Sequence, residues 1–201
     1  MDHDHQNTLS RNTPQTRAAL LLIDVQKGFD DEAYWGGTRN NPEAERVCGQ
    51  MLHIWRKLKR PIFHIRHSST DPRSRLYKTH AGFAFNDVVK PLEDEPVITK
   101  QVNSAFIGTD LRQILDDMGI KDLVIGGLTT DHCVSTTTRM AGNFGYRVRL
   151  ISDACASFGR IGFDGCRYDG QTIHNVHLAS LNDEFCKVMT YKDLLREINV
   201  I

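Results

Sequence analysis

The sequence predicts a three-layer α/β/α sandwich of the Rossmann-like type, with a mostly parallel sheet of about six strands. Apolar runs of strand length alternate with segments of helical periodicity, a pattern typical of a parallel sheet covered by helices on both faces. The first run, residues 18–23, is continuously apolar, as expected of a strand buried on both faces. A chain of 201 residues suits one domain. We predict an N-terminal arm over residues 1–17 and a single domain over residues 18–201.

The clearest predicted helix follows the first strand. Asn41 is a suitable N-cap, and Pro42 fits the first helical position. From Ala44 to Leu58, apolar residues recur at spacings of three and four and form one stripe. Pro61 prevents the helix from continuing.

Further strands and helices alternate along the rest of the chain. The remaining strands are predicted over residues 62–66, 97–99, 123–125, 148–151 and 187–190. The remaining helices are predicted between Thr109 as cap and Gly119 as stop, over about residues 133–143, over residues 171–184, and as a short closing helix. Residues 68–95 lack strong periodicity, so we expect a lid or substrate loop there.

Composition narrows the classes of function. Lys plus Arg (25) balance Asp plus Glu (25), so no net field draws the protein to nucleic acid or to an anionic membrane. No apolar run approaches the roughly 20 residues that span a bilayer, and no signal peptide is recognisable. We therefore expect a cytoplasmic protein with neither nucleic acid nor membrane as partner. Five cysteines without paired C-x-x-C spacing argue against a disulfide framework or a zinc ribbon.

Three reactive side chains follow the ends of predicted strands. Asp24 closes the first strand, Lys100 closes the third, and Cys133 follows the fourth at the start of a predicted helix. The carboxyl ends of parallel strands meet at one sheet edge, where ligands bind in open α/β sheets. An acid, a cation and a thiol there form a candidate nucleophile assembly. Because a helix N-terminus and an ammonium both stabilise a thiolate, we expect a lowered pKa for Cys133.

Three segments around these residues resemble motifs of the isochorismatase-like hydrolases. Residues 22–29 (LIDVQKGF) look like the D-x-Q-x-x-F motif, and residues 100–106 (KQVNSAF) are similar to the K-x-x-x-S-A-F segment. Residues 127–134 (GLTTDHCV) resemble the G-x-x-T-x-x-C-V nucleophile turn. The motifs occur in the family's order, and the likeness runs from about residue 18 to residue 190.

The resemblance implies a role for each reactive residue. Cys133 would be the nucleophile, Asp24 the general base and acid, and Lys100 the cation that stabilises the thiolate and holds Asp24. A cis peptide between Leu128 and Thr129 is also implied, with the N–H groups of Thr129 and Cys133 as the oxyanion hole. The implied reaction is hydrolysis of a C–N bond in a small amide, carbamoyl or ureido substrate through a thioester. The resemblance further implies a homodimer or homotetramer that needs no cofactor.

Candidates for the substrate pocket come from the motifs, from an adjacent loop and from the end of the second strand. They are Gln26, Phe29, Trp35, His67 and Phe106. Phe29 and Phe106 lie inside the family motifs, whereas aromatic residues elsewhere are more often part of the core.

The histidines do not predict a metal centre. Nicotinamidases of this family bind a metal through a D-x-H motif after the second strand, but here no aspartate lies two residues before His67. His64 and His67 also point to opposite faces of a strand, so they cannot easily share an ion. We expect no metal, and we interpret His174 and His177 as structural residues of an amphipathic helix.

Other functions remain as alternatives. Isochorismatase-type hydrolysis of a vinyl ether is one, although true isochorismatases generally lack the cysteine that stands here as Cys133. A non-catalytic binding or scaffold protein is another, but such a protein has no physical need for all three reactive groups. A redox-sensing protein would also use a reactive thiol, yet no resolving cysteine lies beside Cys133 in the sequence.

Overall fold

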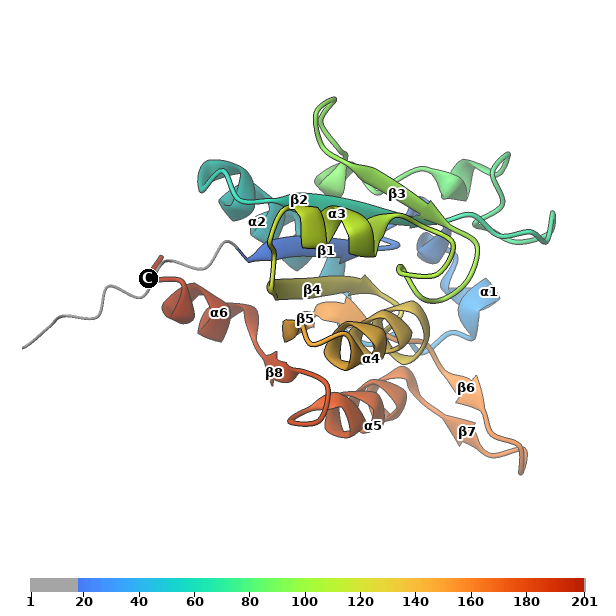
Figure 1. The fold of residues 1–201 in the computed structure, drawn as a ribbon. Coiled ribbons are helices and arrows are strands. Elements are labelled where there is room, and N and C mark those ends of the chain that lie inside the picture. Colours follow the sequence, from blue (N-terminus) through green and yellow to red (C-terminus); the bar gives the residue numbers. More distant parts are fainter. Residues whose placement is uncertain (1–17, 201) are drawn as a thin grey trace, which may run out of the picture.

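A six-stranded parallel sheet forms the centre of the computed structural model, which describes residues 18–200 (Figure 1). The strand order is β3–β2–β1–β4–β5–β8, and all neighbouring pairs are parallel. The strands are β1 (Ala19–Ile23), β2 (Ile62–His67), β3 (Val97–Lys100), β4 (Asp122–Leu128), β5 (Arg147–Ala156) and β8 (Lys187–Met189). The predicted fold class is confirmed. The predicted arm over residues 1–17 lies outside the described residues.

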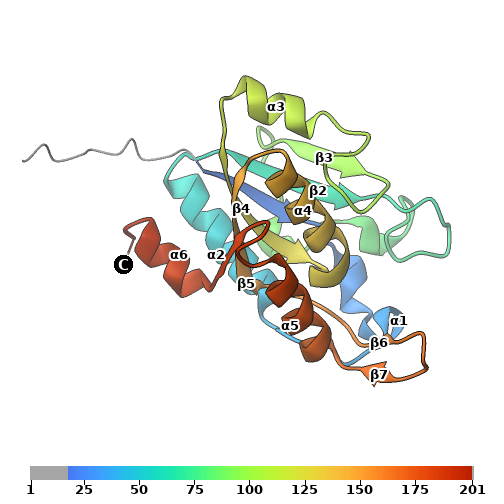
Figure 2. The same cartoon turned by 60° about the horizontal axis from the view of Figure 1, so that its bottom comes forward.

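Helices cover both faces of the sheet, as the two ribbon views show (Figure 1, Figure 2). On one face lie α2 (Ala44–Lys57) and α6 (Tyr191–Glu197), and on the other lie α3 (Leu111–Asp117), α4 (Ser135–Asn143) and α5 (Gly170–Leu181). Strand β1 feeds both layers, because Leu20 and Leu22 pack toward α2 while Leu21 and Ile23 pack toward the opposite layer. Burial on both faces explains why this run is continuously apolar.

The order of the strands in the sheet determines which strand ends lie next to one another. After β1 the chain builds β2 and β3 on one side, then returns to build β4 on the other. The register pairs Ile23 with Gly127 and His67 with Lys100. Asp24 and the turn after β4 therefore flank the point where the strand order reverses, which is where open α/β sheets bind ligands.

The start of α2 differs from the prediction. The N-cap is Glu43, and its side chain makes no capping hydrogen bond. Asn41 instead donates its side-chain amide to the carbonyls of Ser152 (3.0 Å) and Cys155 (2.8 Å) in β5. The prediction of Asn41 as N-cap was wrong because tertiary hydrogen bonds to a distant strand use its side chain.

The segment that contains Cys133 also begins differently. The predicted helix start at Cys133 is replaced by a π-helical turn, Thr130–Val134, which leads directly into α4. The run of Ser and Thr residues at the start of α4 is helical despite its poor intrinsic propensity. Packing compensates: Thr137 is fully buried and its hydroxyl accepts a hydrogen bond from the backbone N–H of Ala105 (3.0 Å).

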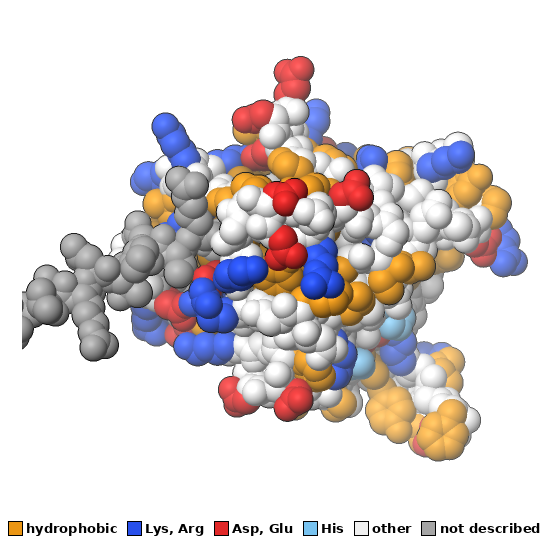
Figure 3. Space-filling view, in the orientation of Figure 1, with side chains coloured by type: hydrophobic (Ala, Val, Ile, Leu, Met, Phe, Trp, Pro, Cys, Tyr) orange, Lys and Arg blue, Asp and Glu red, His pale blue; other side chains and the backbone are white. Residues whose placement is uncertain are grey.

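Several short elements were not predicted. They are the antiparallel hairpin β6 (Arg160–Ile161) and β7 (Arg167–Tyr168), helix α1 (Glu32–Trp35), and the 3₁₀ turns η1 (Lys27–Asp30), η2 (Ala81–Phe83) and η3 (Asp87–Val89). Two-residue strands and single turns are too short to show a periodicity in sequence. The hairpin exposes Ile161 and Phe163, and Figure 3 shows apolar side chains gathered at its place in the molecule. Within residues 18–200, no helix has both the length and the apolar character needed to cross a bilayer.

Candidate active site

The structure brings the three predicted reactive side chains together at the carboxyl edge of the sheet. Lys100 Nζ donates a hydrogen bond to Asp24 Oδ2 at 2.6 Å. Cys133 Sγ lies within 4.8 Å of a carboxylate oxygen of Asp24 and of a ring nitrogen of His67. Asp24 and Lys100 are buried, with 0% and 1% of their surface exposed, and Cys133 is 8% exposed. A thiol, a carboxylate and an ammonium thus share one site that is largely shielded from water.

The protonation of Cys133 differs from the prediction. Burial, followed by the nearby Asp24 carboxylate, raises the pKa of the Cys133 thiol well above its usual range, and Lys100 only partly opposes this. Burial alone would lower the pKa of Lys100, but Asp24 and Cys133 reverse the effect and raise it. The expected low thiol pKa was wrong because the ammonium is paired with Asp24 and the sulfur is buried. The resting site therefore holds a neutral thiol beside an ion pair.

His67 completes the group of side chains around Lys100. Its Nδ1 atom lies 3.2 Å from Lys100 Nζ. Gln26 fixes the His67 backbone on both sides, because its Oε1 accepts from the His67 N–H (2.8 Å) and its Nε2 donates to the His67 carbonyl (3.1 Å). The Gln26 amide also donates to the carbonyl of Phe83 (3.0 Å). This predicted pocket residue thus makes its polar contacts inside the protein and joins strand ends.

The same side chains include one possible set of metal ligands. Across residues 18–200, the only cluster of three side chains that could hold an ion is formed by Asp24, His67 and Cys133. This cluster does not fit a metal ion, because the Lys100 ammonium already makes hydrogen bonds to Asp24 and His67 and supplies the positive charge there. His64 takes no part and bonds to Glu95 instead (2.8 Å). That the protein works without a metal ion remains a prediction from the sequence.

The turn that carries Cys133 is held from two distant segments. A cis peptide joins Leu128 to Thr129, as the family resemblance implied. The Thr129 carbonyl points into the π-helical turn and accepts from the N–H groups of His132 (3.1 Å) and Val134 (3.2 Å). The hydroxyl of Thr130 is 2.8 Å from Nδ1 of His174 in α5.

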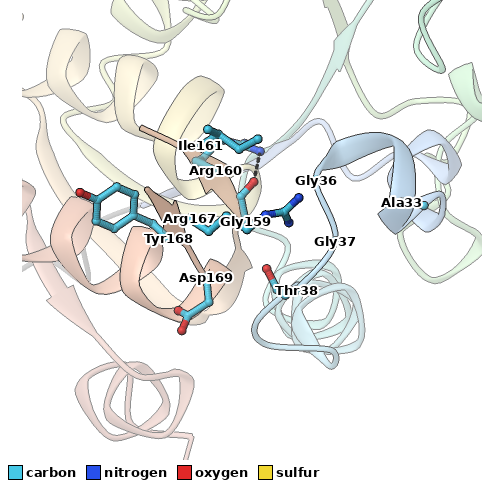
Figure 4. A pocket seen from close by; sticks show the side chains of 10 residues that line it. All are labelled: Ala33, Gly36, Gly37, Thr38, Gly159, Arg160, Ile161, Arg167, Tyr168 and Asp169. Carbon is cyan, nitrogen blue, oxygen red and sulfur yellow. Dashed lines mark hydrogen bonds between the residues drawn. The ribbon is translucent and has the colours of Figure 1, made fainter. Parts of the chain in front are cut away.

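The hairpin supplies the second support for this turn. Asp131 accepts hydrogen bonds from the Ser157 hydroxyl (3.0 Å) and from Nε of Arg160 (2.8 Å). Arg160 also donates to the carbonyl of Trp35 (2.9 Å), so one guanidinium joins the hairpin, the α1 segment and the turn that carries Cys133. Figure 4 shows the base of the hairpin facing the loop at Gly36. The residues of these two segments line a cavity of about 500 Å³. Sequence reasoning missed Arg160, since no pattern near it in the chain points to this contact.

The predicted aromatic residues lie in two separate clusters. Phe29 is buried and stacks against Trp35, with ring centroids 4.6 Å apart. Phe106 is also buried, but it packs against Phe144 (5.4 Å) and Tyr146 (6.0 Å) in the core beneath α3 and α4. The structure therefore does not bring Phe29 and Phe106 into one pocket wall.

Asn103 is a neighbour of the thiol that sequence reasoning did not select. Cys133 Sγ donates to Asn103 Oδ1 at 3.8 Å, and Asn103 itself is exposed. The sequence feature that could have pointed to Asn103 is its position between Lys100 and Ser104 in the second motif. Asn103 thus places an exposed amide beside the thiol.

The fold and this edge of the sheet define the class: an α/β/α protein with a buried thiol, carboxylate and ammonium at its topological switch point. Residues 18–193 match the family model described as the isochorismatase domain. The chain belongs to the isochorismatase family, whose members are hydrolases.

Individual relatives agree with this assignment. The chain is 45% identical to the isochorismatase family protein YrdC of Bacillus subtilis (strain 168) over 183 residues, which cover 91% of this chain and 97% of YrdC. A crystal structure of an isochorismatase-family protein from Chromobacterium violaceum superposes over 100% of both chains with a TM-score of 0.88 and 39% identity. Nicotinamidase 3 of Arabidopsis thaliana is 27% identical over 164 residues, covering 75% of this chain and 79% of that protein.

Proposed function

We propose that the protein is a cysteine hydrolase that cleaves a C–N bond in a small amide, carbamoyl or ureido compound. The observation that carries the proposal is the shared buried site of Cys133, Asp24 and Lys100. A relative named a nicotinamidase supports an amide as the class of substrate. The proposed chemistry uses side chains and backbone N–H groups of the chain itself, together with one water molecule.

In the first half of the reaction, Cys133 attacks the substrate carbonyl. Because the raised pKa keeps this thiol protonated at rest, a base must remove its proton as the S–C bond forms, and Asp24 is the base within reach. The carbonyl π electrons move to oxygen, and the N–H groups of Thr129 and Cys133 bind this oxyanion. Lys100 balances the charge and keeps Asp24 oriented.

The second half returns the site to its starting state. The C–N bond breaks, and the protonated Asp24 gives its proton to the departing nitrogen, which leaves as ammonia or an amine. A water molecule then attacks the thioester while Asp24 accepts one of its protons. The C–S bond breaks, the acid is released, and the sulfur recovers its proton.

A screen for ammonia release from small amides, carbamoyl and ureido compounds tests this proposal. The wild type and Cys133→Ala are compared with Cys166→Ala, which removes an exposed thiol outside the site. We expect turnover by the wild type and by Cys166→Ala, and a loss of at least about 10³-fold in Cys133→Ala. Turnover that survives in a folded Cys133→Ala protein would contradict the proposal.

The alternatives predict different results in the same experiment. A vinyl ether hydrolase would release no ammonia, and its activity would not require the thiol. A redox-sensing protein would oxidise reversibly at Cys133 without turning over any amide. A non-catalytic scaffold would show neither behaviour.

A further inference from the structure

We infer that His67 is a positioning residue, whose Nδ1 atom accepts a hydrogen bond from Lys100 and so holds the ammonium between Asp24 and Cys133. The inference rests on the proposed function and adds a side chain to the three implied by the motifs. It also assigns one specific tautomer to a histidine that the sequence offered only as a pocket candidate.

The donors and acceptors around Lys100 determine the direction of this hydrogen bond. A lysine ammonium has three N–H donors and no acceptor. Its partners at hydrogen-bond distance are Asp24 Oδ2 (2.6 Å) and His67 Nδ1 (3.2 Å), and the Cys133 thiol is close enough to raise the pKa of Lys100. Since Lys100 can only donate, Nδ1 of His67 must offer its lone pair. The ring proton of His67 is therefore on Nε2.

The charges around the ring favour the same state. Burial and the neighbouring Lys100 lower the pKa of His67, against the opposing effects of Asp24 and of the Val102 backbone. A protonated ring would direct an N–H at an ammonium that is itself almost fully buried. The groups that face His67 from the surrounding elements are Asp24 after β1, Lys100 of β3, and Cys133 in the π-helical turn.

The backbone holds the ring in place for this task. His67 is the last residue of β2 and pairs in register with Lys100 of β3. The side chain of Gln26 bonds both the N–H and the carbonyl of His67, so the ring extends from a fixed backbone. Gln26, two residues after Asp24, thus has a structural role: its side chain fixes the backbone of His67.

Loss of the imidazole would leave one N–H of a buried ammonium without an acceptor. Lys100 is only 1% exposed, so an apolar side chain that fills the place of the imidazole would leave water little access to this N–H. Lys100 would then shift toward its remaining partners, and the thiolate that forms at Cys133 would lose a correctly placed cation. The inference thus predicts slower chemistry at sulfur, even with reagents that are not substrates.

The tautomer can be observed directly by NMR of protein labelled with ¹⁵N-histidine. The signals of His67 are assigned as those that disappear in His67→Asn. We expect a neutral ring at pH 7, with the proton on Nε2 and an unprotonated Nδ1. A proton on Nδ1, or a cationic ring at pH 7, would overturn the inference.

Alkylation of Cys133 by iodoacetamide, mapped by mass spectrometry, tests the effect on the thiol. His67→Asn keeps an acceptor near the position of Nδ1, and we expect a rate within about threefold of the wild type. His67→Leu removes the acceptor, and we expect alkylation at least about tenfold slower. His53→Leu makes the same change on the exposed surface of α2 and should leave the rate unchanged.

The outcomes separate the two proposals. Cys186 has the same 8% exposure as Cys133 and is the internal reference within each protein. If wild-type Cys133 reacts no faster than Cys186, Asp24 does not assist removal of the thiol proton as the proposed mechanism requires, and the proposed function fails. If wild-type Cys133 reacts faster but folded His67→Leu matches it, only the inference about His67 is wrong. Equal slowing in His67→Asn and His67→Leu also contradicts it, because the hydrogen-bond acceptor would then be irrelevant.

Discussion

Lys100 is a buried lysine whose charge depends on the side chains around it. Burial disfavours the ammonium, and the Asp24 carboxylate compensates by pairing with it at 2.6 Å. An ion pair with both side chains buried is sensitive to the loss of either member, because the remaining charge has neither water nor a partner.

Lys100→Met should therefore lower the free energy of unfolding by about 3–5 kcal/mol, since it leaves Asp24 buried without its cation. The double variant Asp24→Asn, Lys100→Met should recover much of this loss because it removes both charges. Urea unfolding measures the values. Lys27→Met is the matched control, because the exposed Lys27–Asp87 pair should contribute no more than about 1 kcal/mol. Equal losses in the two lysine variants would contradict the expectation.

His174 makes the stability of the protein depend on pH. Burial lowers the pKa of His174 to about 4, and its Nδ1 atom is hydrogen-bonded to Thr130 in the turn that carries Cys133. The unfolded chain protonates this ring near pH 6.5. Because the folded pKa lies below the unfolded value, the stability contribution is complete above pH 6.5 and is lost as the pH falls toward 4.

Between pH 7 and pH 5, the wild type should lose about 2 kcal/mol more of its free energy of unfolding than His174→Asn. The comparison with the variant cancels the other histidines, which titrate in both proteins. Chemical denaturation at the two pH values gives the difference. A pH dependence that His174→Asn leaves unchanged would rule out this role.

At the scale of elements, the close packing of β1 against β4 brings two parts of the site together. Strand β1 lies against β4 so closely that Gly127 faces the backbone of Ile23. A Cβ atom at Gly127 would lie 2.0 Å from the carbonyl oxygen of Ile23, and the φ angle of Gly127 is +134°. Glycine at this position allows the ends of the two strands that carry Asp24 and the Cys133 turn to approach.

Gly127→Ala should destabilise the protein by more than about 3 kcal/mol, because backbone must move to admit the methyl group. Gly145→Ala is the matched control: its φ is +85°, but nothing lies within 4 Å of the added Cβ. The control should cost only about 1–2 kcal/mol from the left-handed conformation. Thermal or urea unfolding compares the two, and similar losses would show that the close approach to Ile23 is unimportant.

At the scale of the whole molecule, the order of the strands gathers residues from distant parts of the chain. Lys100 lies 76 residues after Asp24, and Cys133 lies a further 33 residues along the chain, yet the three side chains share one buried site. The reversal of strand order between β1 and β4 produces this, since it leaves adjacent strand ends open to a ligand.

The family resemblance also predicts assembly into a homodimer or homotetramer. Light scattering coupled to size exclusion should therefore give a mass two or four times the chain mass of 22.8 kDa. The measured mass should stay the same over a range of micromolar protein concentrations. A single species with the mass of one chain throughout that range would contradict the prediction.

Sequence alone was enough to predict the alternation of strands and helices, the parallel sheet, and the placement of Asp24, Lys100 and Cys133 at or just after the carboxyl ends of strands. These follow from local hydrophobic periodicity and from short motifs, which act over a few residues. The tertiary structure decided the contact of Arg160 with Asp131, the hydrogen bonds of Asn41, the high pKa of the thiol and the partner of His67. Each depends on burial and on neighbours far away in the chain. These contacts and the thiol pKa are set by packing, because water is excluded and the charged groups come together only after the strands have assembled.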